Sequence, residues 1–312
     1  MNSLIKRLGF GCWQIGGNRQ LNGVNNGWHP IEKNQRVALV ERAIELGFTF
    51  FDTASSYGDG ESEEILGLGV YNSRRRDKVQ ICTKINLTKG AEEWPGNWRS
   101  IEKNIQKSLE RLKVDKIDVL LLHNPPLDFI CEKNKGFFEE AKARLYIDRY
   151  GVSARSLFDL EASIKLGFGQ IFQWNFSILE RRALKILEAY SSNKSFTFVG
   201  RSILYRGLLT DNFVNMGVDK RFNDARSKLN FDVVEWVYKN AVTLRPLAFD
   251  LGLTLSQLAV SYALMNPVVP ISLIGVRTFD NLDSLEHLLS IERAKLQACY
   301  EVASDFVPLP FD

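Results

Sequence analysis

The stretch Gly47-Phe48-Thr49-Phe50-Phe51-Asp52-Thr53-Ala54-Ser55-Ser56-Tyr57-Gly58 decides how the rest of the chain is interpreted. It begins as a short apolar run, which is typical of a buried strand, and stops at an aspartate followed by small residues. Asp52 and Tyr57 are therefore polar groups at the carboxyl end of a strand, where a parallel barrel builds its active site. A purely structural core strand that ends in an aspartate-capped turn would show the same pattern. The sequences at the ends of the other strands are needed to distinguish the two interpretations.

Composition excludes several classes of protein. The 312 residues are 45% hydrophobic and 25% charged, with a net charge of +3, which indicates a globular chain without the concentrated basic surface of a nucleic-acid-binding protein. The N-terminal segment lacks the apolar core of a signal peptide, and no run of about 18 apolar residues predicts a membrane span. Three histidines without a Cys/His cluster argue against a metal site. Four scattered cysteines suggest a reducing compartment, so we expect a cytoplasmic protein. They are Cys12, Cys82, Cys131 and Cys299.

Short apolar runs alternate with longer amphipathic segments along the whole chain. Eight such strand-helix units, with strands that are apolar on both faces, predict an α/β fold: a closed parallel (β/α)8 barrel, or TIM barrel, with long loops at its C-terminal face. No Pro, Gly or Ser linker divides the chain, so residues 1–312 are expected to form a single domain. The predicted strands are 8–13, 47–52, 79–84, 116–123, 146–153, 170–174, 196–200 and 269–275, and the predicted helices are 35–46, 62–72, 98–112, 137–144, 156–166, 179–190, 233–251, 255–265 and 282–289.

Polar residues follow three consecutive predicted strands. Asp52 and Tyr57 follow the second strand, Lys84 ends the third, and His123 ends the fourth before Pro125. Separately, Lys84 could extend its ammonium from a strand end to water, and His123 could be a histidine satisfied before a proline turn. Because a parallel barrel brings the carboxyl ends of its strands to one face, the four side chains together indicate a site.

These four residues form a coherent acid-base set. Tyrosine has a reference pKa of about 10, and an ammonium beside it favours the phenolate and is expected to lower that pKa. Asp52 would keep Lys84 charged and oriented, because a buried ammonium requires a partner. His123 could donate a hydrogen bond to a carbonyl oxygen on which negative charge develops. The set would move a proton onto or off an oxygen atom.

Eight segments extend this pattern over the chain. Through these segments the sequence resembles the aldo-keto reductase superfamily over essentially its whole length. The resemblance implies NADPH-dependent reduction of an aldehyde or ketone, with Tyr57 as proton donor and Asp52, Lys84 and His123 in the remaining catalytic roles. No GxGxxG joins a strand to a helix, so the cofactor would lie extended across the barrel mouth instead of in a Rossmann fold. The segments are LGFGCWQIGG (8–17), GFTFFDTASSYGDGESEEILG (47–67), ICTK (81–84), SLERLKVDKIDVLLLH (108–123), YGVS (150–153), QWN (173–175), RGLLT (206–210) and LIGVR (273–277).

The resemblance also implies a cofactor site, position by position. Ser153 and Gln173 match the residues that hold the nicotinamide carboxamide. Arg277 matches the basic position that grips the adenosine 2′-phosphate, and a guanidinium there favours NADPH over NADH; a surface charge flanking a helix is the alternative. Ser202, Leu204 and Gly207 fall in the loop that wraps the pyrophosphate.

Four positions depart from the family pattern. Ala154 stands where the family usually has Asn, which removes one carboxamide hydrogen bond. Arg201 stands where an aromatic ring commonly stacks on the nicotinamide, and a cation there would disfavour the positively charged oxidised cofactor. Ser284-Leu285 replaces the usual Glu-Asn pair, which leaves the adenine contacts open.

The substrate is not identified by these motifs. Trp13 matches a family pocket position and is also expected at the cofactor site. Trp94 and Trp98 are further candidates for the substrate wall, although Trp98 could instead anchor the start of a helix. The cations within 212–229 suit either an anionic, sugar-derived substrate or a solvated loop. Two other functions stay open: a sugar dehydrogenase that runs in the oxidative direction, and a cofactor-binding regulatory or scaffold protein. The oligomeric state is also left open.

Overall fold

The computed structural model describes residues 3–18, 20–21, 24–25, 27–29, 31–86, 98–218 and 222–310. Trp94, a candidate for the substrate wall, lies outside the described residues.

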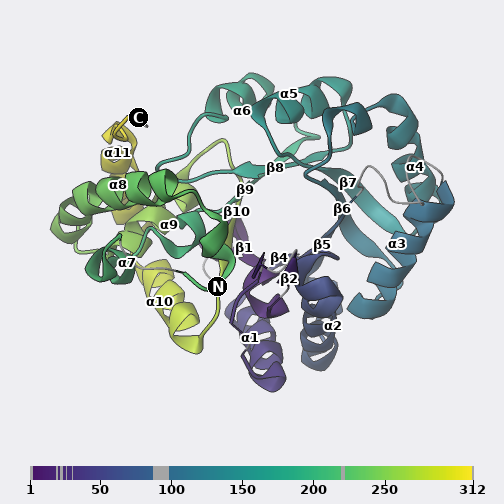
Figure 1. The fold of residues 1–312 in the computed structure, drawn as a ribbon, viewed down its shortest axis with the longest axis horizontal. Helices are drawn as coiled ribbons and strands as arrows, with labels where there is room; N and C mark the ends of the chain where they lie inside the picture. The colour runs from purple at the N-terminus through teal and green to yellow at the C-terminus, as the bar shows by residue number, and fades with distance from the viewer. Residues whose placement is uncertain are drawn as a thin grey trace.

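Eight parallel strands close into a barrel, which confirms the predicted TIM barrel (Figure 1). Around the ring the order is β1-β10-β9-β8-β7-β6-β5-β4, and β4 pairs with β1 to close it. A short antiparallel pair, β2 (Gln20–Leu21) and β3 (Val24–Asn25), lies outside this barrel. The barrel strands are β1 (Leu8–Gly11), β4 (Phe50–Asp52), β5 (Gln80–Ile85), β6 (Ile117–His123), β7 (Ile147–Ser153), β8 (Ile171–Asn175), β9 (Thr197–Arg201) and β10 (Ile271–Gly275).

Helices surround the ring of strands on its outside (Figure 1). Each predicted helix is present, but α6 begins five residues later than expected. There the Ser177 hydroxyl accepts hydrogen bonds from the backbone of Leu179 and Glu180, which holds a turn before the helix. The helices are α1 (Lys33–Leu46), α2 (Glu61–Ser73), α3 (Trp98–Leu112), α4 (Glu132–Ala143), α5 (Leu157–Leu166), α6 (Leu184–Tyr190), α7 (Asp211–Met216), α8 (Phe231–Asp250), α9 (Leu255–Met265), α10 (Phe279–Ser290) and α11 (Arg293–Asp305).

An apolar layer fills the barrel interior below the strand ends. Successive side chains of a strand point to opposite faces, so the residue two positions after each member of this layer also points inward. Phe50 is followed in this way by Asp52, Cys82 by Lys84, and Leu121 by His123. The apolar layer therefore forms the floor on which polar side chains stand. Its members are Phe50, Cys82, Val119, Leu121, Ile171, Val199 and Leu273.

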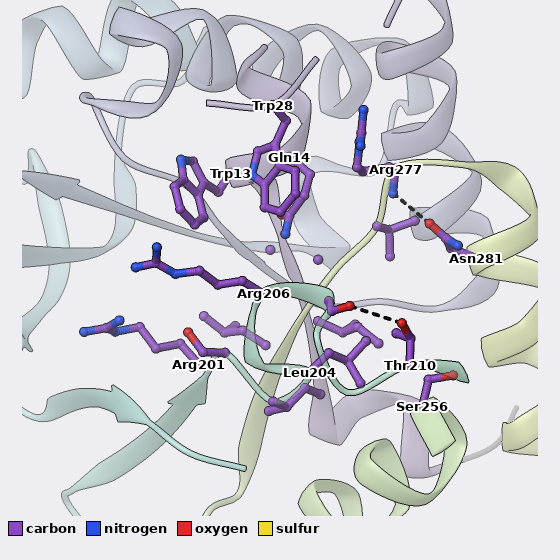
Figure 2. A pocket seen from close by; sticks show the side chains of 18 of the residues that line it. Trp13, Gln14, Trp28, Arg201, Leu204, Arg206, Thr210, Ser256, Arg277 and Asn281 are labelled. Carbon is purple, nitrogen blue, oxygen red and sulfur yellow. Dashed lines mark hydrogen bonds between the residues drawn. The ribbon is translucent and has the colours of Figure 1, made fainter. Parts of the chain in front are cut away.

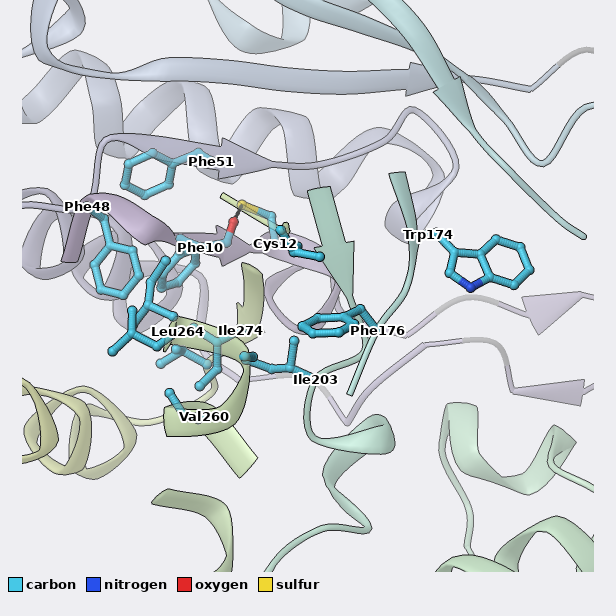
Figure 3. Packing of buried hydrophobic residues seen from close by; sticks show 14 of the residues in the cluster. Phe10, Cys12, Phe48, Phe51, Trp174, Phe176, Ile203, Val260, Leu264 and Ile274 are labelled. Carbon is cyan, nitrogen blue, oxygen red and sulfur yellow. Dashed lines mark hydrogen bonds between the residues drawn. The ribbon is translucent and has the colours of Figure 1, made fainter. Parts of the chain in front are cut away.

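Aromatic packing holds β4 in place from the side that faces away from the barrel interior. Phe51 faces away from the barrel interior and packs on Phe10 of β1, with ring centroids 5.5 Å apart, and Phe48 meets Phe10 edge-on at 5.9 Å (Figure 3). All three rings are buried. Fully burying one such ring stabilises the fold by about 1.5–3 kcal/mol, so this cluster helps to hold β4, and with it Asp52, in place.

Within the described residues, no single helix passes a test of length and hydropathy for crossing a membrane. The consecutive helices α8 and α9 pass it only as a pair, and they are bent by 85° relative to each other.

Candidate active site

A cavity of about 940 Å³ opens at the carboxyl ends of the strands (Figure 2). Asp52, Tyr57 and His123 line one part of it, and Arg277 and Ser284 line another. The loop after β9 contributes a run of lining residues from Arg201 to Gly207, apart from Tyr205. The cavity is thus long enough to touch loops that follow several different strands.

Asp52 and Lys84 form a buried ion pair beside Tyr57. The Lys84 ammonium also donates hydrogen bonds to the Thr53 carbonyl at 2.7 Å and to the Tyr57 hydroxyl at 3.4 Å. The second oxygen of Asp52 accepts a hydrogen bond from the Gln173 side chain at 2.9 Å. Neighbouring strands β4 and β5 bring the pair together, because Asp52 lies beside Cys82 in register and Lys84 follows two residues later on the same face.

Tyr57 is held at the cavity by a close turn. Its ring lies between Trp13, at a centroid distance of 6.0 Å, and His123, at 5.7 Å. The next residue, Gly58, has a φ of 59°, and a Cβ there would lie 1.8 Å from the carbonyl oxygen of Gly16. Any other residue at position 58 would displace the backbone that carries Tyr57.

The electrostatic expectation for Tyr57 is wrong in its net direction. Burial raises the pKa of the Tyr57 hydroxyl above its usual value of 10, and it outweighs the lowering effect of Lys84. Burial also acts to lower the pKa of Lys84, but Asp52 and Tyr57 overcome it and the lysine pKa is raised. The site therefore holds a protonated tyrosine beside a charged lysine at neutral pH.

His123 is a neutral imidazole at the same end of the cavity. Burial, with help from the charges of Lys84 and Arg201, holds its pKa well below 6.5. Its Nδ1 lies 3.4 Å from the Ser56 hydroxyl. A neutral imidazole carries one N–H, so His123 can donate one hydrogen bond without adding a charge.

Ser153 and Gln173 are fully buried and do not line the cavity. The Ser153 hydroxyl donates to the side-chain Oε1 of Gln173 at 2.8 Å, and the Gln173 side-chain amide donates to Asp52. The structure therefore connects these two residues to the ion pair rather than exposing them at the surface of the cavity.

Arg201 spans the ends of the strands that carry Ser153 and Gln173. It donates to the Asn175 side chain at 2.7 Å, to the Ala154 carbonyl at 3.1 Å and to the Asn124 side chain at 3.5 Å. Its Nε is buried without a partner in the described part of the chain. The guanidinium, which lines the cavity, thus occupies the region next to Ala154, where a family asparagine is missing.

The loop after β9 has an unusual backbone. Ser202, Tyr205 and Arg206 have φ values of 65°, 49° and 57°, and Gly207 has a φ of 81°. Left-handed conformations at residues other than glycine cost free energy and cluster at ligand sites, and alternation of right- and left-handed residues turns successive N–H groups toward a common anion. Ser202, Leu204 and Gly207, for which the family resemblance implies contact with the pyrophosphate, all line the cavity here.

Arg277 lies at another part of the cavity wall. Its backbone N–H donates to the Asn281 side chain at 3.2 Å, and its guanidinium donates to the His29 carbonyl at 3.3 Å (Figure 2). Its Nε is buried and lacks a partner among the described residues. Ser284 and Leu285, which replace the family's Glu-Asn pair, also line this region.

Trp28, Arg206 and Asn281 are among the cavity residues that were missed in the sequence. Trp28 is buried and lies between the guanidinium groups of Arg226 and Arg277, at 5.5 and 5.6 Å. Trp28 sits in a Gly/Asn-rich loop without periodicity, so the only signal was an isolated large aromatic residue. For Arg206, the only signal in the sequence was its place at the start of the segment RGLLT (206–210).

The candidate substrate-wall residues lie in different places. Trp13 lines the cavity, and so do Asn212, Arg226, Lys228 and Leu229 from the segment 212–229. Trp98 does not line it. The indole begins α3, packs against the outer core and carries the Arg144 guanidinium at 5.0 Å, which makes it a packing residue.

The model of the Aldo/keto reductase family matches residues 7–299. One relative, the aldo-keto reductase yakc [NADP(+)] of Schizosaccharomyces pombe, is 27% identical, with 84% of this chain and 77% of the relative covered. Another, a probable voltage-gated potassium channel subunit beta of Arabidopsis thaliana, is 26% identical over 85% of this chain and 81% of that protein. Among solved structures, the glycerol dehydrogenase AKR11B4 from Gluconobacter oxydans superposes with a TM-score of 0.72 at 24% identity, covering 98% of this chain and 94% of that one.

Proposed function

The chain belongs to the aldo/keto reductase family, and from that premise we propose that it reduces an aldehyde or ketone to an alcohol with NADPH. The observation that carries the proposal is a protonated Tyr57 that lies beside the Lys84–Asp52 pair and the neutral His123 at one end of a long cavity.

The residues around the cavity fit a phosphorylated dinucleotide. Arg277 has a buried Nε without a partner in the described part of the chain, and a guanidinium suits the 2′-phosphate that distinguishes NADPH from NADH. The N–H groups of Tyr205 and Gly207 donate to the Ser202 and Leu204 carbonyls, and the other N–H groups of the Ser202–Gly207 loop would suit the pyrophosphate. A relative in yeast is named for NADP(+), which agrees with this choice. When bound, NADPH would supply a hydride to the carbonyl carbon.

The chain's own residues would handle the proton. Tyr57 would donate the proton of its hydroxyl to the carbonyl oxygen, since its raised pKa keeps it protonated at neutral pH. Lys84 would stabilise the resulting phenolate, and Asp52 would keep Lys84 charged and oriented. His123 would donate one hydrogen bond to the same oxygen as negative charge develops.

Arg201 would take the place of two family features in positioning the nicotinamide. It lies where an aromatic ring commonly stacks, and its guanidinium reaches the Ala154 carbonyl where an asparagine is usual. Ser153 and Gln173 would support this region from behind through their link to Asp52.

Two other functions can be separated from this one. A dehydrogenase needs Tyr57 as a phenolate base, and the raised pKa of that hydroxyl opposes this role at neutral pH. The similarity to a probable potassium channel subunit favours a cofactor-binding scaffold as the second candidate. Oxidation of NADPH against a panel of aldehydes and ketones tests the choice. Turnover of a carbonyl supports the reductase, whereas tight NADPH binding without turnover of any carbonyl contradicts it and favours the scaffold.

A further inference from the structure

The cavity carries more positive than negative charge. Its acidic lining residues, Asp52 and Asp211, already form ion pairs with Lys84 and Arg245. Arg226 pairs with Asp224 at 2.6 Å. The remaining cationic lining residues have no carboxylate partner within the described ranges, and an excess of one sign of charge in a cleft favours ligands of the opposite sign. They are Arg201, Arg206, Lys228 and Arg277.

The cofactor of the proposed function does not account for all of this charge. In the proposed function, Arg277 binds the 2′-phosphate, and backbone N–H groups of the Ser202–Gly207 loop bind the pyrophosphate. Arg206 and Lys228 remain, next to the Arg201 that would position the nicotinamide. The Arg201 and Arg206 side chains extend in the same direction on the side of the cavity where Trp13 lies (Figure 2).

Arg206 lies next to the reacting end of the cavity. Its guanidinium carbon is 5.4 Å from the centroid of the Trp13 ring. The centroid of the Tyr57 ring is 6.0 Å from that of the same tryptophan. Trp13 also matches the substrate-pocket position of the family resemblance. Trp13 thus contacts both residues, so a group that Arg206 binds would lie at the same end of the cavity as Tyr57.

The guanidinium of Arg206 is half-buried at the cavity wall, and most of its N–H groups are bound by no described residue. It has five N–H donors, yet its one hydrogen bond to a described residue is 3.3 Å long and goes to the Ala225 carbonyl. Burial lowers its pKa from the usual 12.5, which reflects the cost of removing the charge from water. Its backbone is also in the left-handed region, with a φ of 57°. An anion at this position would offset the desolvation of the guanidinium.

We propose that Arg206 binds an acidic group of the substrate, so that the preferred substrates are aldehydes or ketones that carry a carboxylate or a phosphate. This inference rests on the proposed function, which it makes more specific. Arg201, on the same side of the cavity, adds its field to that of Arg206. The acidic group fixes the orientation of the substrate while its carbonyl reaches Tyr57 and His123.

The test compares carbonyl compounds that differ only in charge. With NADPH saturating, kcat/KM is measured for 4-carboxybenzaldehyde against 4-formylbenzamide, and for glyceraldehyde 3-phosphate against glyceraldehyde. The full-length protein is compared with Arg206→Gln, with Arg206→Lys, and with Arg149→Gln, which removes an equal charge from β7 outside the cavity lining.

We expect the wild-type protein to prefer the charged member of at least one pair. In Arg206→Gln this preference should fall roughly 10- to 100-fold, because the variant loses one charge-assisted contact. Arg206→Lys keeps part of the preference and Arg149→Gln keeps all of it, and the Kd for NADPH changes far less than the preference does. Equal losses for charged and neutral compounds, with weaker NADPH binding, would overturn the inference and place Arg206 on the pyrophosphate.

The inference and the proposed function fail in different ways. Turnover of neutral aldehydes without any preference for charge leaves the reductase standing and overturns the role of Arg206. If no carbonyl is turned over, the reductase fails. In that case the Kd values of 4-carboxybenzaldehyde and 4-formylbenzamide, measured in the presence of NADP+, test the anion site on its own. Tighter binding of the acid that is lost in Arg206→Gln supports the anion site, and equal Kd values contradict it.

Discussion

Lys84 and Asp52 form an ion pair that is closed off from solvent beneath Tyr57, with side chains 0% and 4% exposed. The apolar layer of the barrel interior lies below the pair, and the Thr53 carbonyl and the Gln173 amide complete its hydrogen bonds. The same pair thus supports the fold and positions the proton donor.

Breaking the pair should be costly for stability. Lys84→Met leaves a buried carboxylate without its cation, and removing one partner of a buried pair destabilises a protein by about 3–5 kcal/mol. The double variant Asp52→Asn/Lys84→Met should lose clearly less than the sum of the two single losses, because it leaves no unpaired charge. Urea unfolding of the four proteins measures this coupling. Additive losses would show that the two side chains do not interact.

His123 should make stability depend on pH. Unfolded histidine titrates near pH 6.5, while the pKa of His123 in the folded protein lies well below it. As pH falls below 6.5, the unfolded chain takes up a proton that the folded chain does not, so stability decreases by up to about 1.4 kcal/mol per pH unit. Above pH 6.5 this contribution is constant.

Urea unfolding between pH 5 and 7.5 measures this effect. The slope should be smaller in His123→Gln and unchanged in His287→Gln, which removes an exposed histidine from α10. A His123→Gln variant with the wild-type slope would refute the buried, neutral imidazole.

Arg277 should select NADPH over NADH. Arg277→Gln should weaken NADPH roughly 10- to 100-fold, since it removes a charge-assisted contact with the 2′-phosphate, and should leave NADH nearly unaffected. Fluorescence titration with both cofactors measures the two Kd values. Arg293→Gln on the exposed side of α11 is the matched control. Parallel losses for NADPH and NADH would place Arg277 away from the 2′-phosphate.

Arg201 should bias binding toward the reduced cofactor. Oxidised nicotinamide carries a positive charge, and the guanidinium beside it would repel that charge. Arg201→Tyr should therefore lower the ratio of the NADP+ Kd to the NADPH Kd roughly tenfold. Arg201→Lys, which keeps the charge, should retain most of the ratio. An unchanged ratio in Arg201→Tyr would mean that this cation does not face the nicotinamide ring.

The barrel and the convergence of the four polar residues could be predicted because they depend on local pattern. Each strand is a short apolar run, and a parallel barrel brings strand ends such as those at Asp52, Lys84 and His123 to one face. The helix α11 was missed because three small or apolar positions, Leu296, Cys299 and Ala303, supply its buried face.

The features that could not be predicted depend on three-dimensional distances. The pKa of Tyr57 is set by the balance between burial and the charge of Lys84, and the sequence shows the lysine but not the depth of burial. The contact of Trp28 with Arg226 joins two loops that lie far apart in the chain. The hydrogen bonds of Arg201 to Asn175 and Ala154 follow from the mutual placement of three strand ends, which no motif encodes.

The most direct measurement of the central claim is the turnover of Tyr57→Phe with NADPH and a carbonyl that the wild-type protein reduces. The variant loses the hydroxyl and keeps the ring that packs between Trp13 and His123. Loss of a positioned proton donor should lower kcat by roughly 10²- to 10⁴-fold, while the Kd for NADPH stays close to that of the wild type. Turnover that stays near the wild-type rate would contradict the assignment of Tyr57 as the proton donor.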